Sequence, residues 1–335
     1  MLLLKAAAAF VSSLAASWLV TPKVIEYSRR KGYLGRDVHK PGQPLIPEMG
    51  GLSILVGVAV GSVICCLLAL NVEPWIVVFT CCTMIAGGIG ALDYLVTLTG
   101  VTKTALTVIA CLPLIVGAVL WPKHIVIGRP ELPFIGTMRF TIIYWILLPF
   151  AVAAPANAVN MIDTFNGVMP ITSSFSVLGL LVASLILGRW EALLMCCILL
   201  GALLGYMPYN LYPSKVFTSD VGSLAVGAAI GVIAVVGRLE IVGIVALMPQ
   251  IMNSFYILSS VKGLLERRQI RERPTVVLGD NVVAANRSER APLTLANLIL
   301  SRGPLKEPEL VKRYAILSFS SFILSVVTAV LMVVT

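Results

Sequence analysis

The sequence predicts an all-α, polytopic membrane protein with about ten transmembrane helices and a site on its cytoplasmic face. Of its 335 residues, 58% are hydrophobic and only 12% are charged, whereas a soluble domain has roughly 45–50% apolar and about 25% charged residues. The apolar residues gather in long runs, and a helix needs about 20 of them to cross a bilayer. These observations predict one transmembrane domain over residues 1–335.

The apolar runs give the expected spans in chain order. The first lacks a basic start and a small-residue cleavage site, so we interpret it as a retained helix rather than a signal peptide. The seven Cys fall within the runs and are expected to be packing residues rather than disulfides or zinc ligands. Segment 122–140 alternates apolar and polar residues with Gly and Pro, which indicates a small hairpin. The spans lie at 2–20, 50–71, 75–93, 104–121, 141–158, 169–187, 191–208, 221–236, 240–261 and 314–334.

The basic residues predict the orientation. Most of the 25 Lys and Arg lie in loops on one side of the spans, and loops rich in Lys and Arg face the cytoplasm. An even number of spans then places both termini outside. This topology and contact with anionic lipid headgroups account for much of the net charge of +9. Nucleic-acid binding is not expected, because the basic residues are spread among membrane loops. The cytoplasmic loops are expected near 21–48, 94–103, 159–168, 209–220 and 262–313.

Polar clusters occupy these cytoplasmic loops. One of them, NAVNMIDTFNGV, has a polar residue at every third position from Asn157 to Asn166. At about 100° per residue this series drifts by roughly 60° per step, so it cannot line one helix face. We therefore expect a helix to end near Asn160 and a loop to carry Asp163 and Asn166. The other clusters are GRDVHKPGQPLIPEMGG, GALDYLVTLTGVTK, PYNLYPSKVFTSDVGS and the looser ERRQIRERP.

Each cluster taken alone has a structural explanation. Asp93 could be a helix cap or a solvated boundary residue, and Asp220 suits an N-cap. Against this, several hard oxygen donors share one membrane face with lysines and arginines. Mg²⁺ takes a few carboxylate or amide oxygens together with substrate phosphates, and Lys and Arg bind the remaining phosphate charge. A transporter would instead place charges near the middle of the membrane, beside broken helices.

In order and together, the clusters resemble those of the polyprenyl-phosphate N-acetylhexosamine-1-phosphate transferases. NAVNMIDTFNGV resembles the Asn-Ala-x-Asn…Asn/Asp-Gly motif of this superfamily, and NLYPSKVFTSDVGSLAVG resembles its Asn-x-x-Pro…Val-Phe-x-Gly-Asp motif. IPEMGG resembles the first cytoplasmic loop. MPQIMNSFY, followed by an Arg-rich loop and TLANLIL, is similar to the eukaryotic and archaeal branch. The likeness covers nearly the whole chain.

The resemblance implies a reaction and a set of partners. A sugar-1-phosphate, expected to be N-acetylglucosamine-1-phosphate, would pass from a UDP-sugar to polyprenyl or dolichyl phosphate, releasing UMP. This is the first step of lipid-linked oligosaccharide synthesis for N-glycosylation. Mg²⁺, or Mn²⁺ in its place, would be the cofactor. The membrane would be the plasma membrane of an archaeon, or the ER membrane in a eukaryote. A homodimer is implied by the resemblance alone.

The resemblance also implies residue roles by motif position. Asn166 and Asp220 would bind the metal, while Asp93, Lys103 and Asp163 would act in catalysis, with Lys103 facing phosphate. Phe217 would stack on uracil, and Glu48 would contact the nucleotide-sugar. Arg271 and Arg273 would hold the pyrophosphate or the sugar, although their loop departs from the His-Arg-Ile-Pro-Arg pattern. The full set of expected substrate contacts is Lys40, Glu48, Asn160, Asn210, Phe217, Arg271 and Arg273.

Three positions depart from the superfamily pattern. Tyr94 replaces the second Asp of a usual Asp-Asp pair, Thr164 replaces the Gly after Asp163, and Ser219 replaces the Gly before Asp220. If the absent carboxylate matters, Tyr94→Asp should raise a low turnover. If Tyr94 is packed into this particular site, the same change should lower stability and activity. The alternatives to an active transferase are a catalytically impaired lipid- and nucleotide-sugar-binding homologue and, third, a transporter or flippase.

Overall fold

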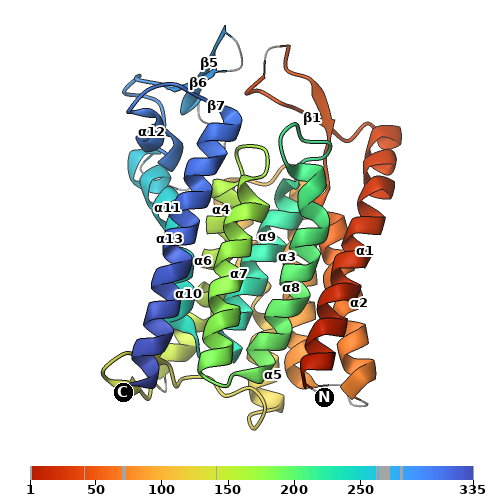
Figure 1. Ribbon diagram of the computed structural model, residues 1–335, viewed down its shortest axis with the longest axis vertical. Coiled ribbons are helices and arrows are strands. Elements are labelled where there is room, and N and C mark those ends of the chain that lie inside the picture. Colours follow the sequence, from red (N-terminus) through yellow and green to blue (C-terminus); the bar gives the residue numbers. More distant parts are fainter. Residues whose placement is uncertain are drawn as a thin grey trace.

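The computed structural model describes residues 2–40, 42–69, 73–140, 142–261, 263, 272–279 and 282–334. Long helices run side by side along one direction of the molecule (Figure 1). Within the described residues, nine helices are long and apolar enough to cross a membrane, or up to ten if a bent pair counts as one span. This confirms the predicted fold class of a polytopic, all-helical membrane protein.

Most of the spans are single continuous helices. Two spans are each built from a pair of helices. The first pair is α4 (Gly100–Ile109) with α5 (Leu112–Leu120). The second pair is α10 (Glu240–Ala246) with α11 (Met248–Val261), and these two helices are bent by 70° relative to each other. Pro113 at the start of α5 fits the first of these breaks, because proline has no N–H to continue the preceding helix. The continuous helices are α1 (Leu2–Lys31), α2 (Gly51–Ala69), α3 (Pro74–Val96), α6 (Ile142–Ile162), α7 (Val168–Ile186), α8 (Trp190–Asn210), α9 (Ser219–Val236) and α13 (Glu307–Val333).

Two helices extend well beyond their predicted spans. α1 continues past residue 20 to Lys31, and α13 begins at Glu307 rather than at residue 314. The extensions are polar, with three basic residues in the last turn of α1 and two acidic residues in the first turn of α13. Hydropathy locates the apolar part of a helix, so it does not detect a polar continuation. The break between α6 and α7 falls at residues 163–167, as the polar spacing predicts.

The loop regions contain short strands at both ends of the bundle. β3 (Glu131–Leu132) pairs with β4 (Gly136–Thr137), which confirms the hairpin predicted within 122–140. At the opposite end β1 (Leu34–Arg36) pairs with β2 (Leu45–Pro47). A three-stranded antiparallel sheet joins β5 (Thr275–Leu278), β6 (Val282–Ala285) and β7 (Leu305–Lys306), and it is accompanied by the short helix α12 (Leu295–Leu300).

The sheet β5–β6–β7 and α12 form a cap on one end of the bundle (Figure 1). Both chain termini lie at the other end of the bundle (Figure 1), as an even number of crossings requires. The cap is held by a hydrophobic cluster that includes Phe165, Val283, Leu295, Leu310 and Tyr314. It therefore packs on the 163–167 loop and on the first turns of α13.

The central helix is α9. Within its apolar window, 83% of the residues are buried, the highest share among the candidate spans described. It packs against α2, α3, α6 and α8, and small residues allow this approach, as is common between membrane helices. A Cβ on Gly90 would lie 2.3 Å from the Asp220 carbonyl oxygen, and one on Gly51 would lie 2.1 Å from the Gly222 nitrogen. These contacts fix the start of α9 against α3 and α2.

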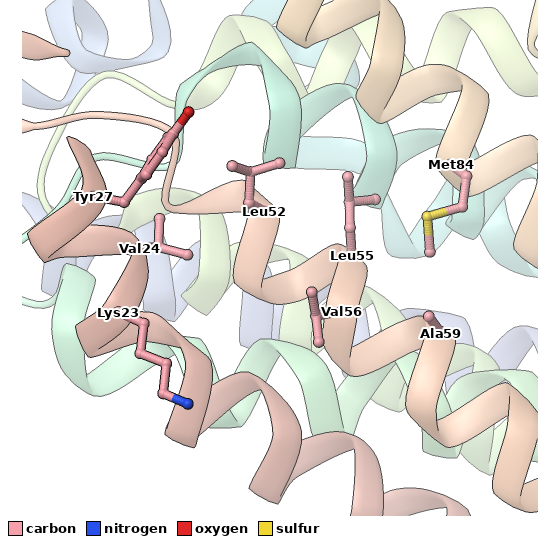
Figure 2. A pocket seen from close by; sticks show the side chains of 8 residues that line it. All are labelled: Lys23, Val24, Tyr27, Leu52, Leu55, Val56, Ala59 and Met84. Atoms are coloured by element: carbon pink, nitrogen blue, oxygen red, sulfur yellow. The ribbon is translucent and has the colours of Figure 1, made fainter. Parts of the chain in front are cut away.

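A shallow apolar groove of about 470 Å³ lies on the outside of the bundle. Figure 2 shows its lining side chains, which come from α1, α2 and α3. Apart from Lys23 and Tyr27, the lining is apolar, as expected for a surface that contacts lipid chains. Lys23 lies toward the C-terminal end of α1, where its long side chain can reach the headgroup region.

Candidate active site

Three charged side chains from three helices meet at the end of the bundle that carries the cap, opposite the two chain termini. The Lys103 Nζ lies 2.9 Å from Asp93 Oδ2 and 2.5 Å from Asp220 Oδ2. Asp93 is in the last turn of α3, Lys103 in the first turn of α4, and Asp220 in the first turn of α9. The side chain of Lys103 is 9% exposed, so two carboxylates share one largely buried ammonium. The predicted catalytic residues Asp93 and Lys103 and the predicted metal ligand Asp220 thus lie together.

Asp220 is not the N-cap that its sequence position suggests. The N-cap of α9 is Thr218, which makes no side-chain capping bond, and Asp220 lies inside the first turn. The preceding loop is tied to the start of α2. The Phe217 N–H donates to the Pro47 carbonyl at 2.8 Å, and the Gly50 N–H donates to the Phe217 carbonyl at 2.9 Å. These backbone bonds place Asp220 and half-buried Phe217 beside the 45–51 segment.

Ser219 is strained at the position where the superfamily usually has glycine. Its φ is +57°, a conformation that costs an L-residue about 1–2 kcal/mol. Its Oγ is buried without a hydrogen-bond partner in the described part of the chain. We expect Ser219→Gly to raise the free energy of unfolding by about 1 kcal/mol, after the entropic cost of glycine is subtracted.

Thermal unfolding in detergent checks this prediction. Ser219→Ala is the matched control, because it removes the orphan hydroxyl and keeps the left-handed backbone strain. It should therefore gain less than Ser219→Gly. A lower melting temperature for Ser219→Gly than for the wild-type protein would contradict the strain at this position.

The second predicted metal ligand, Asn166, lies in a separate buried network. Its Nδ2 donates to Asp37 Oδ2 at 3.1 Å, and its backbone N–H donates to Glu307 Oε1 at 2.8 Å. Lys40, predicted to contact substrate, forms an ion pair with the same Asp37 oxygen. The Lys40 ammonium also lies 4.8 Å from the centre of the Tyr212 ring. The structure therefore shows Lys40 engaged with the protein itself.

Two predicted substrate contacts have clear structural partners. Asn160 accepts a hydrogen bond from the Ser223 hydroxyl at 2.8 Å, which links the end of α6 to α9 one turn after Asp220. Asn210 is 3% exposed; it accepts from the Gly167 N–H at 3.1 Å and donates to the Val216 carbonyl at 2.9 Å. Asn210 thus connects the 163–167 loop to the 211–218 loop. Asp163 lies in the first of these loops and is partly buried.

Glu48 and Tyr94 are adjacent. The Tyr94 hydroxyl lies near the Glu48 carboxylate, and the Tyr94 ring packs edge-on against Tyr33 with centroids 5.4 Å apart. A Cβ on Gly35 would lie 2.2 Å from Glu48 Oε1, so this glycine makes room for the carboxylate. Tyr94, which replaces the usual second Asp, therefore packs beside Glu48, a predicted contact of the nucleotide-sugar.

Of the two predicted arginines, only Arg273 lies within the described residues. It precedes β5 and is exposed, whereas Arg271 lies outside the described residues. In contrast, the structure adds two residues without a predicted role: Asp37, which belongs to the predicted cluster GRDVHKPGQPLIPEMGG, and Glu307, which belongs to none. Glu307 begins a helix with Pro in its first turn and a second acidic residue at Glu309. This is a recognisable helix-start signal that could have identified it.

A largely apolar cavity of about 640 Å³ opens beside Lys103. Side chains of α4, α6, α9, α10 and α11 line it, with Lys103 and Asn160 at the end near the cap and Glu240 at the other. Several lining residues lie at the molecular surface: Phe150 is 59% exposed, Ile244 51% and Phe255 65%. The cavity therefore connects the charged cluster to the lipid-facing side of the protein. It has the chemistry to hold a long apolar chain that ends in an anion.

The donor chemistry of the site fits a hard divalent cation that is completed by substrate. The carboxylates of Asp93 and Asp220 converge on one positive charge, and Asn166, in the separate network of the 163–167 loop, also carries an amide oxygen. Among the described residues, no group of three or more His, Cys, Asp or Glu side chains forms a metal cage. Mg²⁺ commonly binds through one or two carboxylates, with substrate phosphates and waters in the remaining positions.

The chain is similar in sequence to a family of glycosyl transferases and to several named membrane transferases. The family model described as glycosyl transferase family 4 matches residues 76–238. A protein of Saccharolobus solfataricus, provisionally named a UDP-N-acetylglucosamine–dolichyl-phosphate N-acetylglucosaminephosphotransferase, is 30% identical over 227 residues, covering 66% of this chain and 68% of its own. The phospho-N-acetylmuramoyl-pentapeptide-transferase of Methylacidiphilum infernorum is 28% identical over 285 residues, covering 72% and 75%.

Proposed function

Because the chain belongs to glycosyl transferase family 4, a family of membrane phosphoglycosyltransferases, we propose that it transfers N-acetylglucosamine-1-phosphate, or a closely related N-acetylhexosamine-1-phosphate, from a UDP-sugar to polyprenyl or dolichyl phosphate. UMP is the second product. The observation that carries the proposal is the Asp93–Lys103–Asp220 cluster at the mouth of the apolar cavity. Here a charged phosphate and a lipid tail can be bound together.

The proposed chemistry follows from the positions of these groups. An acceptor phosphate oxygen forms a bond to the sugar-linked phosphorus of the donor, and the pyrophosphate bond breaks to release UMP. Lys103 binds the acceptor phosphate, while the cavity between α4, α6, α9, α10 and α11 holds its tail. A monoalkyl phosphate has a second pKa of about 6, so the nucleophile is already largely ionised at neutral pH. Positioning and charge neutralisation then supply most of the catalysis.

Members of this family are generally Mg²⁺-dependent, and we propose the same for this chain. Asp220 and Asn166 would hold the ion, and Mg²⁺ would act as a Lewis acid and template on the pyrophosphate. Asp93 keeps Lys103 in place from the other side, at 2.9 Å. The archaeal relative supports a plasma-membrane location, and the Lys- and Arg-rich loops support a site on the cytoplasmic side.

A transfer assay tests the proposal. The purified protein is reconstituted in liposomes with dolichyl phosphate, radiolabelled UDP-N-acetylglucosamine and Mg²⁺. We expect an organic-soluble labelled product, stoichiometric release of UMP, and complete loss of both with EDTA. Absence of a lipid-linked product, with retained binding of the UDP-sugar, would instead support the catalytically impaired homologue. Sugar counterflow in vesicles without a lipid product would support a transporter.

Phe217 is proposed to stack on the base of the donor. Stacking of a base on an aromatic side chain contributes about 1–3 kcal/mol. Phe217→Ala should therefore weaken UDP-sugar binding by about 5–150-fold and leave dolichyl phosphate binding unchanged. Isothermal titration with each substrate measures the difference. Leu211→Ala, at an exposed position in the same loop, is the matched control. Equal losses for both substrates would assign Phe217 to packing.

A further inference from the structure

The loop 163–167 is held by three other parts of the chain. Asp37, from the segment between α1 and α2, accepts from the Asn166 side chain. Glu307, at the start of α13, accepts from the Asn166 backbone N–H. Asn210, at the end of α8, accepts from the Gly167 N–H. Gly167 has φ +86°, a conformation available to glycine at little cost. Three acceptors thus surround two consecutive residues of the loop.

The network is deeply buried and charged. Asp37 is 3% exposed, Asn166 4% and Glu307 2%. Removing two carboxylates from water is costly, and apolar residues of similar size often stabilise a fold as well or better. Lys40 pairs with Asp37 and supplies one compensating charge. Glu307 Oε2 has no hydrogen-bond partner in the described part of the chain. Holding the loop in place does not by itself require two buried carboxylates.

The charge of Asp37 determines how the Asn166 amide is oriented. An amide has a donor nitrogen and an acceptor oxygen, whereas an ionised carboxylate only accepts. Asp37 therefore selects the orientation with Nδ2 directed toward it, at 3.1 Å, and Oδ1 directed away. A neutral hydroxyl or amide at position 37 can both donate and accept a hydrogen bond, so it would be compatible with either orientation of the Asn166 amide. The carboxylate thus leaves only an oxygen available to a cation.

We propose that Asp37 and Glu307 are positioning residues that hold Asn166 with its Oδ1 directed toward the divalent cation of the site. Asp37 sets the direction of the amide, and Glu307 fixes the backbone at the same residue. Through Glu307, α13 and the cap next to it become part of the metal site, although neither Asp37 nor Glu307 binds the metal. This inference rests on the proposed metal-dependent function, so its test includes metal binding without turnover.

A reciprocal exchange tests the role of Asp37. Asn166→Asp alone places a second carboxylate beside Asp37, and we expect Mn²⁺ affinity to fall at least 10-fold, as for a lost hydrogen bond to a charged group. Asp37→Asn alone releases the amide orientation and should also weaken binding. The double variant Asp37→Asn/Asn166→Asp restores a donor–acceptor pair and again presents an oxygen. Its affinity should return to within about threefold of wild type, a strong departure from additivity.

Mn²⁺ binding is measured by EPR titration of the full-length protein in detergent with UDP, and thermal unfolding is measured without metal. Glu307→Gln keeps the accepting oxygen and should retain the affinity, whereas Glu307→Ala should lose it. Glu309→Ala is the matched control, because this exposed side chain lies in the same turn and accepts a hydrogen bond from the Lys306 N–H.

The outcomes separate this inference from the proposed reaction. The positioning role is supported if the Mn²⁺ affinity of the double variant is higher than the sum of the two single changes predicts. This holds even if no labelled lipid forms and the transferase proposal fails. Additive effects of the two changes on affinity overturn it, even in a protein that transfers sugar phosphate. Changes in thermal stability alone, with unchanged Mn²⁺ affinity in every variant, also overturn it and leave the network as a purely structural contact.

Discussion

Replacing Asp220 by alanine is expected to abolish sugar-phosphate transfer. Asp220 contributes a carboxylate at the point where α9 meets the charged cluster, and its Oδ2 lies 2.5 Å from the Lys103 ammonium. Loss of a charged metal ligand removes several kcal/mol of transition-state stabilisation, which corresponds to a rate reduction of about 10³-fold or more. Steady-state transfer at about 1–50 mM Mg²⁺, a roughly 50-fold range of concentration, measures the loss.

The Asp220→Ala protein should remain folded. Lys103 keeps Asp93 as its partner at 2.9 Å, so the substitution leaves no unpaired buried charge. Glu131→Gln is the control, because Glu131 pairs with Arg189 at the opposite end of the bundle and should not affect transfer. If Asp220→Ala retained substantial activity at ordinary Mg²⁺ concentrations, Asp220 could not be a metal ligand.

Tyr94→Asp is expected to lower both stability and turnover. The sequence alone gave more weight to the opposite result, because the superfamily usually has a second carboxylate at this position. In the structure the Tyr94 hydroxyl lies near the Glu48 carboxylate, to which it can donate, and its ring packs on Tyr33. An aspartate would place a second negative charge near Glu48 and remove the donor. A lost hydrogen bond to a charged group costs about 1.5–3 kcal/mol, or roughly 10–100-fold in rate.

Tyr94→Phe separates the hydroxyl from the ring. It should preserve most of the thermal stability and lose part of the activity, with the larger change in the KM for the UDP-sugar if Glu48 contacts the sugar. Rates and melting temperatures of both variants, measured beside wild type, decide between the two interpretations. A turnover above wild type for Tyr94→Asp would show that the carboxylate is missing rather than replaced.

Much of the membrane-embedded fold could be predicted from the sequence. A lipid environment requires long apolar helices, so hydropathy located the spans to within a few residues at most ends. The predicted hairpin in 122–140 and the loop after α6 were also found. The polar extension of α1 to Lys31 and the cap β5–β6–β7 were not predicted. Their residues meet water on one side, and strands of two to four residues carry little periodic signal.

The candidate site was predicted in part. Topology alone placed Asp93, Lys103 and Asp220 on one membrane face, and the structure brings them within hydrogen-bonding distance. The resemblance assigned Asn166 to the same metal, but its buried partners Asp37 and Glu307 lie 129 and 141 residues away in the sequence. Such long-range pairs are not visible in a single sequence, because a charged residue in a polar loop is unremarkable.

The 70° bend between α10 and α11 and the cavity beside it also affect how an acceptor arrives. Because the cavity opens toward the lipid at Phe150, Ile244 and Phe255, a polyprenyl phosphate can enter it laterally without leaving the bilayer. Encounter then takes place in two dimensions. The acceptor concentration that controls the rate is its number per unit area of membrane, and diluting the acceptor with other lipids would slow the reaction at constant bulk concentration.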